Sequence, residues 1–166
     1  MVSLAALAAA FAAPVRRVVV VTGADAEAVA AAVHASPAVD GRLRLVHAQD
    51  HAEGMGASLR RAAAELSPDC AGVFVLLGDM PRVPHAIFAS LVAAVRAGAP
   101  AAAPVFDGQR GHPALLAAAL LPQLLTLKGD AGARAILKGL GDRLALVEAP
   151  DDGVLFDVDE RGDLPG

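Results

Sequence analysis

Apolar, β-branched runs alternate with alanine-rich segments along the first hundred residues, and this alternation most constrains the fold. The runs predict strands, and the segments that follow them are rich in helix formers. The predicted strands are residues 16–22, 42–48 and 71–77, and the predicted helices are residues 24–35, 57–66 and 84–97. Strands that alternate with helices are typical of α/β proteins with a parallel sheet.

The pattern changes after Gly98, where a polar, glycine-bearing loop at residues 107–111 follows a short strand. Further strands are predicted at residues 101–106, 112–116, 144–148 and 154–158, and further helices at residues 120–127 and 131–140. We therefore expect a three-layer α/β fold, with a mostly parallel twisted sheet and helices on both faces. At 166 residues the chain is expected to form a single domain, residues 1–166.

Composition and charge exclude several classes of partner. Only 3% of the residues are aromatic and the formal net charge is −4, which disfavours nucleic-acid binding by stacking or by phosphate contacts. The apolar start lacks a basic residue before Arg16, so it does not resemble a signal peptide, and no run is long enough for a membrane span. We expect a cytoplasmic protein with a small-molecule substrate, in which the single Cys70 is inert.

Asp79 is the first candidate site residue, in the segment LGDMP that directly follows a predicted buried strand. A carboxylate at the end of such a strand is costly to desolvate unless it is paired or binds a cation. Ligands of parallel sheets gather outside the carboxyl ends of the strands. The alternative is a simple turn, because Gly, Asp and Pro are common turn residues.

Two further segments contain glycine next to polar groups. Gly54, Gly56 and Ser58 precede a predicted helix, where free N–H groups and a small backbone favour an anion or a polar base edge. Arg110 and His112 lie in the loop GQRGHP, which is suited to bind an oxyanion. The alternatives are an ordinary glycine turn, a surface arginine and a histidine at the start of a strand.

Acidic residues close the predicted last strand. Asp157 and Asp159 point to the same side of a strand, and with Asp79 they could bind Mg²⁺ together with substrate phosphates. A solvated chain end is the alternative. Asp130 is placed to cap the helix at residues 131–140, and Arg134 is a candidate phosphate contact.

The order of the motifs resembles one known family. The segments VVVVTG, GMGASL, LGDMP, GQRGHP, GDAGAR and FDVD occur as they do in the nucleotidyltransferases that mature the molybdenum cofactor. These are glycosyltransferase-A-like NTP transferases, and the cytidylyltransferase branch is the most similar. The resemblance implies transfer of a nucleoside monophosphate, CMP from CTP, to a molybdopterin-type cofactor, with a molybdoenzyme or its chaperone as a further partner.

The resemblance also assigns roles to the candidate residues. Asp79 resembles the Mg²⁺ ligand, with Asp157 or Asp159 as its distal partner. Gly54, Gly56 and Ser58 resemble the nucleotide contacts. The pterin-facing loop of the family corresponds to Arg110, Gly111, His112 and Pro113.

One feature of the family is absent from this sequence. Its members begin with a strand and a glycine-rich LAAGxSxRMG-type loop with a lysine, which hold the triphosphate. Here Met1 stands where the first helix of the family begins, and the lysines are Lys128 and Lys138. We therefore expect a sheet without its first strand. A non-catalytic protein that binds the molybdenum cofactor is the alternative function, and a sugar-1-phosphate nucleotidyltransferase is a weaker one.

Overall fold

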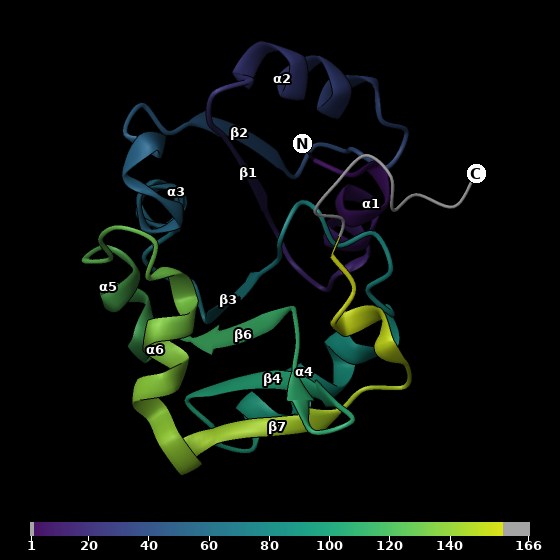
Figure 1. Cartoon of the computed structure of the whole chain (residues 1–166), viewed down its shortest axis with the longest axis vertical. Coiled ribbons are helices and arrows are strands. Elements are labelled where there is room, and N and C mark those ends of the chain that lie inside the picture. The colour runs from purple at the N-terminus through teal and green to yellow at the C-terminus, as the bar shows by residue number, and fades with distance from the viewer. Residues whose placement is uncertain (1, 158–166) are drawn as a thin grey trace.

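The structure, a computed structural model, describes residues 2–157 and contains two sheets within them (Figure 1). The first sheet pairs β1 (Val18–Thr22) with β2 (Leu43–His47) in parallel. The second has the strand order β3-β6-β4-β5, with β7 paired to β4. Its strands are β3 (Gly72–Val75), β4 (Ala101–Phe106), β5 (Gln109–Arg110), β6 (Ala114–Ala117) and β7 (Leu144–Glu148).

The helices are short, and those that follow β1 overlap the predicted segments. They are α1 (Leu4–Ala12), α2 (Ala26–Ala35), α3 (Met55–Ala63), α4 (Ala86–Arg96), α5 (Leu121–Leu124) and α6 (Gly132–Leu140), with 3-10 turns η1 (His51–Glu53), η2 (Ala118–Leu120), η3 (Gly141–Arg143) and η4 (Asp152–Val154). Ser3 is the N-cap of α1, and its hydroxyl accepts hydrogen bonds from the backbone N–H groups of Ala5 and Ala6. Within residues 2–157 no helix combines the length and the apolar character that a bilayer span requires.

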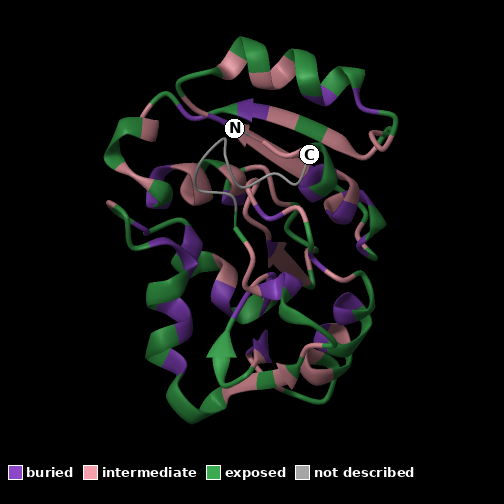
Figure 2. Ribbon diagram, turned by 45° about the vertical axis from the view of Figure 1, so that its right-hand side comes forward, coloured by how far each residue is buried: buried purple, intermediate pink, exposed green. Residues whose placement is uncertain are grey.

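Helices cover both faces of the larger sheet, which confirms the expected three-layer α/β architecture. Ala101 and Ala103 of β4 belong to one core cluster with α5 and α6, whereas Ala102 between them packs in a second cluster with α4. Side chains alternate across a strand, so each face has its own apolar core. Figure 2 shows buried segments along the middle of the molecule and exposed ones around it.

The sheet departs from a continuous parallel arrangement in two ways. Strand β6 runs antiparallel to both β3 and β4, whereas β4 and β7 are parallel. No described strand joins β1 to β3, so the structure contains an interruption at this point. The Arg16 guanidinium lies 3.3 Å and 3.2 Å from Asp69 Oδ2, which places the starts of β1 and β3 at the same end of the molecule.

Two local predictions are wrong. Residues 154–157 do not form a strand; η4 turns the chain here, because the Asp151 carboxylate accepts the N–H of Gly153 and the Val154 carbonyl accepts that of His112. Asp130 does not cap α6: the N-cap residue is Ala131, without a side-chain hydrogen bond. The carboxylate of Asp130 lies instead against Gly54.

Candidate functional site

Asp79 lies in the turn that follows β3, at the carboxyl end of that strand. The turn itself is present, with the Met80 N–H donating to the Leu77 carbonyl at 3.4 Å. The Oδ1 atom of Asp79 is buried and has no hydrogen-bond partner within the described residues. An unpaired buried carboxylate oxygen is costly, and a bound cation or a hydrogen-bond donor from a ligand would remove that cost.

The loop that carries Arg110 and His112 is held by backbone contacts. Asp107 and Gly108 have positive φ values of 48° and 74°, as in a tight hairpin turn between β4 and β5. The Gly111 N–H then donates to the Pro104 carbonyl at 2.9 Å. Arg110 is left exposed at the end of this hairpin.

Gly111 allows the loop to approach η4 closely. A Cβ atom at this position would lie 2.2 Å from the Val154 carbonyl oxygen, and the next residue, His112, donates its N–H to that same oxygen at 2.8 Å. The bond from His112 to Pro113 is cis. The loop and η4 are therefore fastened together, and the His112 ring is half-buried between them and the Asp79 turn.

Charged groups gather around His112. Burial lowers the pKa of His112, and the positive charge of Arg110 lowers it further, while the carboxylates of Asp79 and Asp157 act to raise that pKa. The net effect is a neutral imidazole at neutral pH. Its Nδ1 atom is buried and, like Oδ1 of Asp79, has no partner within residues 2–157.

Arg82 adds a second cation to this end of the sheet. Its guanidinium stacks 4.7 Å from the centroid of the Phe156 ring and lies 3.5 Å from an Asp152 carboxylate oxygen. These contacts connect the segment after Asp79 to the segment that carries Asp157.

The turn at residues 54–58 packs against the loop at residues 128–130. The Gly56 N–H donates to the Gly129 carbonyl at 2.8 Å, and a Cβ atom on Gly56 would lie 2.7 Å from that oxygen. A Cβ atom on Gly54, whose φ is 113°, would lie 2.2 Å from Asp130 Oδ1. Gly54 and Gly56 therefore allow the 54–58 turn to pack against the 128–130 loop, independently of any ligand.

Arg60 holds the two motifs together from the side. Its guanidinium donates to the Leu127 carbonyl at 2.6 Å and to Glu53 Oε2 at 3.1 Å, and it is also paired with Asp50. These hydrogen bonds hold the pKa of the Asp50 carboxyl below its usual range.

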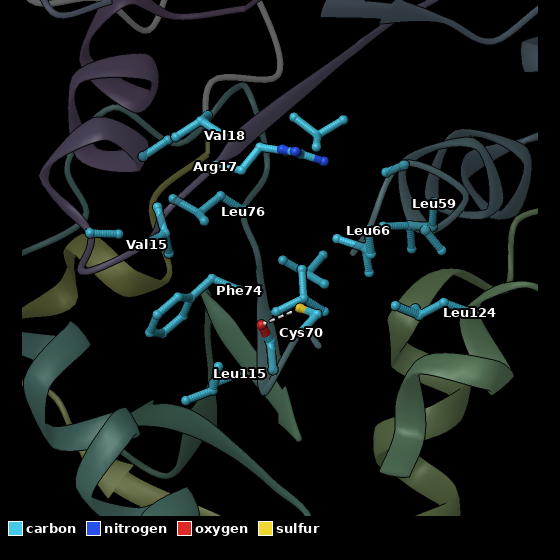
Figure 3. Close-up of a pocket in the computed structure, with 18 of the residues that line it drawn as sticks. Val15, Arg17, Val18, Leu59, Leu66, Cys70, Phe74, Leu76, Leu115 and Leu124 are labelled. Carbon is cyan, nitrogen blue, oxygen red and sulfur yellow. Dashed lines mark hydrogen bonds between the residues drawn. The ribbon is translucent and has the colours of Figure 1, made fainter. Parts of the chain in front are cut away.

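A cavity of about 1030 Å³ separates the 54–58 turn from Asp79. Its wall includes Met55 and Ser58 on one side and Gly78, the neighbour of Asp79, on the other. Figure 3 shows Leu59, Leu66 and Leu124 facing Val15, Phe74 and Leu76 across this space. The two halves of the candidate site are thus on opposite sides of an apolar cavity.

Comparison with known proteins identifies the family. Residues 2–146 match the family model described as MobA-like NTP transferase domain. The chain belongs to this family. It is therefore nucleotidyltransferase-like, as the order of its motifs indicates.

Relatives and neighbours agree with this assignment. Nicotine blue oxidoreductase from Paenarthrobacter nicotinovorans is 32% identical over 154 residues, covering 86% of this chain and 70% of the relative. The crystal structure of an Rv0371c homologue from mycobacterium sp. strain JC1 has a TM-score of 0.74 and 26% identity, covering 95% of this chain and 77% of that one. Rv0371c of Mycobacterium tuberculosis H37Rv, solved in complex with manganese, shares the fold with a TM-score of 0.68 and 24% identity, covering 87% and 74%.

The MobA-like chain brings together some of the predicted site residues and separates others. Asp79, His112 and Asp157 converge at one end of the sheet with Arg110 nearby, whereas Gly54, Gly56 and Ser58 lie across the cavity. Asp159 lies outside the described residues. Sequence reasoning missed Arg82, although a cation three residues after Asp79 was a usable signal.

The residues present fit a metal shared with substrate better than a metal held by protein alone. Within residues 2–157 no group of three or more His, Cys, Asp or Glu side chains is arranged to hold a metal ion. The unpaired Oδ1 of Asp79 offers one anionic oxygen. Mg²⁺ commonly binds through one or two carboxylates, with substrate phosphates and water completing its shell.

Proposed function

We propose that this MobA-like chain transfers a nucleoside monophosphate, CMP from CTP, to the phosphate of a molybdopterin-type cofactor. An oxygen of the acceptor phosphate attacks the α-phosphorus and forms the new P–O bond. The bond from the α-phosphorus to the bridging oxygen breaks, and pyrophosphate leaves with the electron pair. The observation that carries the proposal is the pair of buried, unpartnered atoms, Asp79 Oδ1 and His112 Nδ1, at the carboxyl end of β3.

Asp79 is the proposed Mg²⁺ ligand, with Asp157 or Asp159 as the second carboxylate. Bound Mg²⁺ would neutralise charge on the triphosphate and on the leaving pyrophosphate. Asp79 is suited to this role because its free oxygen is already desolvated and held by the turn after β3. The manganese bound to a protein of the same fold supports a divalent cation in general.

The loop of Arg110, Gly111, His112 and Pro113 is the proposed acceptor site. Arg110 provides a positive charge for the acceptor phosphate, and Arg82 lies on the neighbouring segment. Because the pKa of His112 is lowered, its neutral ring can share a hydrogen bond with a phosphate oxygen without adding charge. Gly54, Gly56 and Ser58 are the proposed nucleotide contacts across the cavity.

The test compares Asp79→Asn with Asp107→Asn in the full chain. Asp107 lies in the exposed hairpin turn with a positive φ, a conformation that asparagine also adopts, so it is a matched control. Molybdopterin is incubated with Mg²⁺ and α-labelled CTP, GTP or ATP, and the dinucleotide product and pyrophosphate are quantified. We expect activity with CTP that is lost by at least ~100-fold in Asp79→Asn and kept in Asp107→Asn.

Two results would contradict parts of this proposal. Metal-dependent CTP binding that survives Asp79→Asn would remove Asp79 as a ligand. Equal use of GTP or ATP would remove the cytidylyl assignment and leave the transferase class. The chain is proposed to act as a single cytoplasmic domain that delivers its product to a molybdoenzyme or its chaperone.

A non-catalytic protein that binds the molybdenum cofactor is the second candidate function. It is favoured by the apolar cavity beside the turn that carries Asp79. Calorimetry with molybdopterin distinguishes the two functions. Binding without turnover and without dependence on Mg²⁺ would favour the second.

A further inference from the structure

We propose that Arg82 is a positioning residue, whose guanidinium stacks on Phe156 and thereby holds Asp157 beside Asp79. The guanidinium carbon of Arg82 lies 4.7 Å from the centroid of the Phe156 ring, and Asp157 is the next residue along the chain. The inference rests on the proposed function, in which Asp79 and Asp157 bind the same Mg²⁺. It adds the means by which this chain holds its second carboxylate in place.

Buried neighbours fix the backbone of Arg82 relative to Asp79. Met80 and Val83 are both buried, and they pack in the core cluster that includes α4. Arg82 lies between them in the sequence, three residues after Asp79, and its side chain is exposed. The Arg82 side chain therefore extends toward solvent from a backbone that is anchored together with the Asp79 turn.

The 3-10 turn η4 is fastened to this segment on one side and to the acceptor loop on the other. A Cβ atom on Gly153 would lie 2.0 Å from the Arg82 carbonyl oxygen, so the two backbones meet at a point where only glycine fits. Val154 is fully buried, and its carbonyl accepts the His112 N–H at 2.8 Å. The start of the segment that leads to Asp157 is thus fixed.

The end of that segment has no comparable backbone support. Its last backbone hydrogen bond runs from the Leu155 N–H to the Asp152 carbonyl at 2.8 Å. Within residues 2–157 the backbone of Phe156 and Asp157 forms no hydrogen bond, and Phe156 belongs to none of the core clusters. The stack with Arg82 is therefore the contact that sets the direction in which the chain leaves η4.

An arginine suits this role better than another side chain. Its planar guanidinium can stack on a ring and pair with a carboxylate at the same time, and Arg82 also lies 3.5 Å from an Asp152 oxygen. Attraction to the metal does not explain the residue, because a positive charge near a cation site repels the cation. Positioning and repulsion therefore predict opposite effects on metal affinity when the charge of Arg82 is removed.

The first experiment measures the order of the Asp157 amide by ¹⁵N NMR relaxation, in the full chain without metal or substrate. The variants are Arg82→Gln and Phe156→Leu. Arg143→Gln is the control, because it removes the same charge from an exposed site next to β7, where β4 begins. We expect an order parameter above ~0.8 in the wild type and the control, and below ~0.6 in both variants. A value already below ~0.6 in the wild type, or unchanged in either variant, would overturn the proposal.

The second experiment measures Mn²⁺ binding in the presence of CTP by electron paramagnetic resonance. We expect Arg82→Gln and Phe156→Leu each to weaken Mn²⁺ binding roughly 3–10-fold, the scale of a cation–π contact, and the double variant to bind no more weakly than either. Arg143→Gln should bind as the wild type does.

Three outcomes of the Mn²⁺ titration would contradict the positioning role. They are tighter or unchanged binding in Arg82→Gln, a loss in Arg82→Gln that Phe156→Leu does not share, and losses that add in the double variant. The second would assign Arg82 a direct contact with the nucleotide. A wild-type chain that fails to bind Mn²⁺ with CTP would instead contradict the proposed function, and the order parameters would still decide whether Arg82 holds Asp157.

Discussion

The contact between the 54–58 turn and the 128–130 loop can be tested by substituting Gly56 with alanine. Gly56 lies within α3, and its φ is not positive, so its backbone accepts a side chain and alanine should favour the helix by up to about 1 kcal/mol. However, the neighbouring loop leaves no room for a side chain at this position. A Cβ atom would lie 2.7 Å from the Gly129 carbonyl oxygen and 3.1 Å from the carbonyl carbon of Lys128.

The size of the effect follows from these distances. Relief of the clash needs a shift of several tenths of an ångström, which stretches the 2.8 Å hydrogen bond from the Gly56 N–H to the Gly129 carbonyl. Overpacking typically costs about 1–3 kcal/mol, and a weakened hydrogen bond adds about 1 kcal/mol. After the helix gain is subtracted, we expect a net loss of about 1–3 kcal/mol, or roughly 2–12 °C in Tm for a chain of this size.

Gly139→Ala is the matched control. Gly139 also lies within a helix, α6, but a Cβ atom there would meet nothing within 4 Å. This change should stabilise the protein by about 0.5–1 kcal/mol. Thermal unfolding is followed by circular dichroism without nucleotide or metal. If Gly56→Ala unfolds like the wild type and only nucleotide binding is lost, the glycine is there for the ligand and the reasoning fails.

Two further predictions concern His112 and Arg60. Because the pKa of His112 is lowered on folding, the unfolded chain binds more protons near pH 6.5, so stability measured in EDTA should fall as the pH drops through about 6.5; this slope should flatten in His112→Asn. A slope unchanged in the variant would assign it to another group. Arg60→Lys should lower Tm by about 2–4 °C because a lysine cannot reach Leu127, Asp50 and Glu53 together. Arg61→Lys should have less effect, because Arg61 has one ion pair, to Glu65. Equal shifts in the two variants would contradict the role of Arg60.

Local sequence patterns predicted the elements well because the signals are local. The strand at residues 101–106 and the helix that ends at Ala35 agree with β4 and α2. Residues 154–158 misled the prediction because their alternation of apolar and acidic residues is typical of a strand. The His112 N–H donates to the Val154 carbonyl and helps to fix the turn. This long-range hydrogen bond cannot be predicted from the alternation of residues 154–158.

The arrangement of the candidate site also depends on long-range contacts that local sequence patterns do not encode. Asp79 and His112 were identified because a carboxylate after a buried strand suits a cation, a histidine in a glycine loop suits an oxyanion, and the order of the motifs resembles one family. Their convergence depends on β6 lying antiparallel between β3 and β4, and strand order is set by pairing that periodicity does not encode. The contact of Gly56 with Gly129 cannot be predicted from the sequence either, because each motif alone is typical of a glycine turn.

The position of the cavity bears on the proposed site. In α/β sheets, ligands bind outside the carboxyl ends of the strands, and here Asp79 and the 54–58 turn stand on either side of the same cavity. A substrate that contacts both of these groups must therefore extend across the cavity.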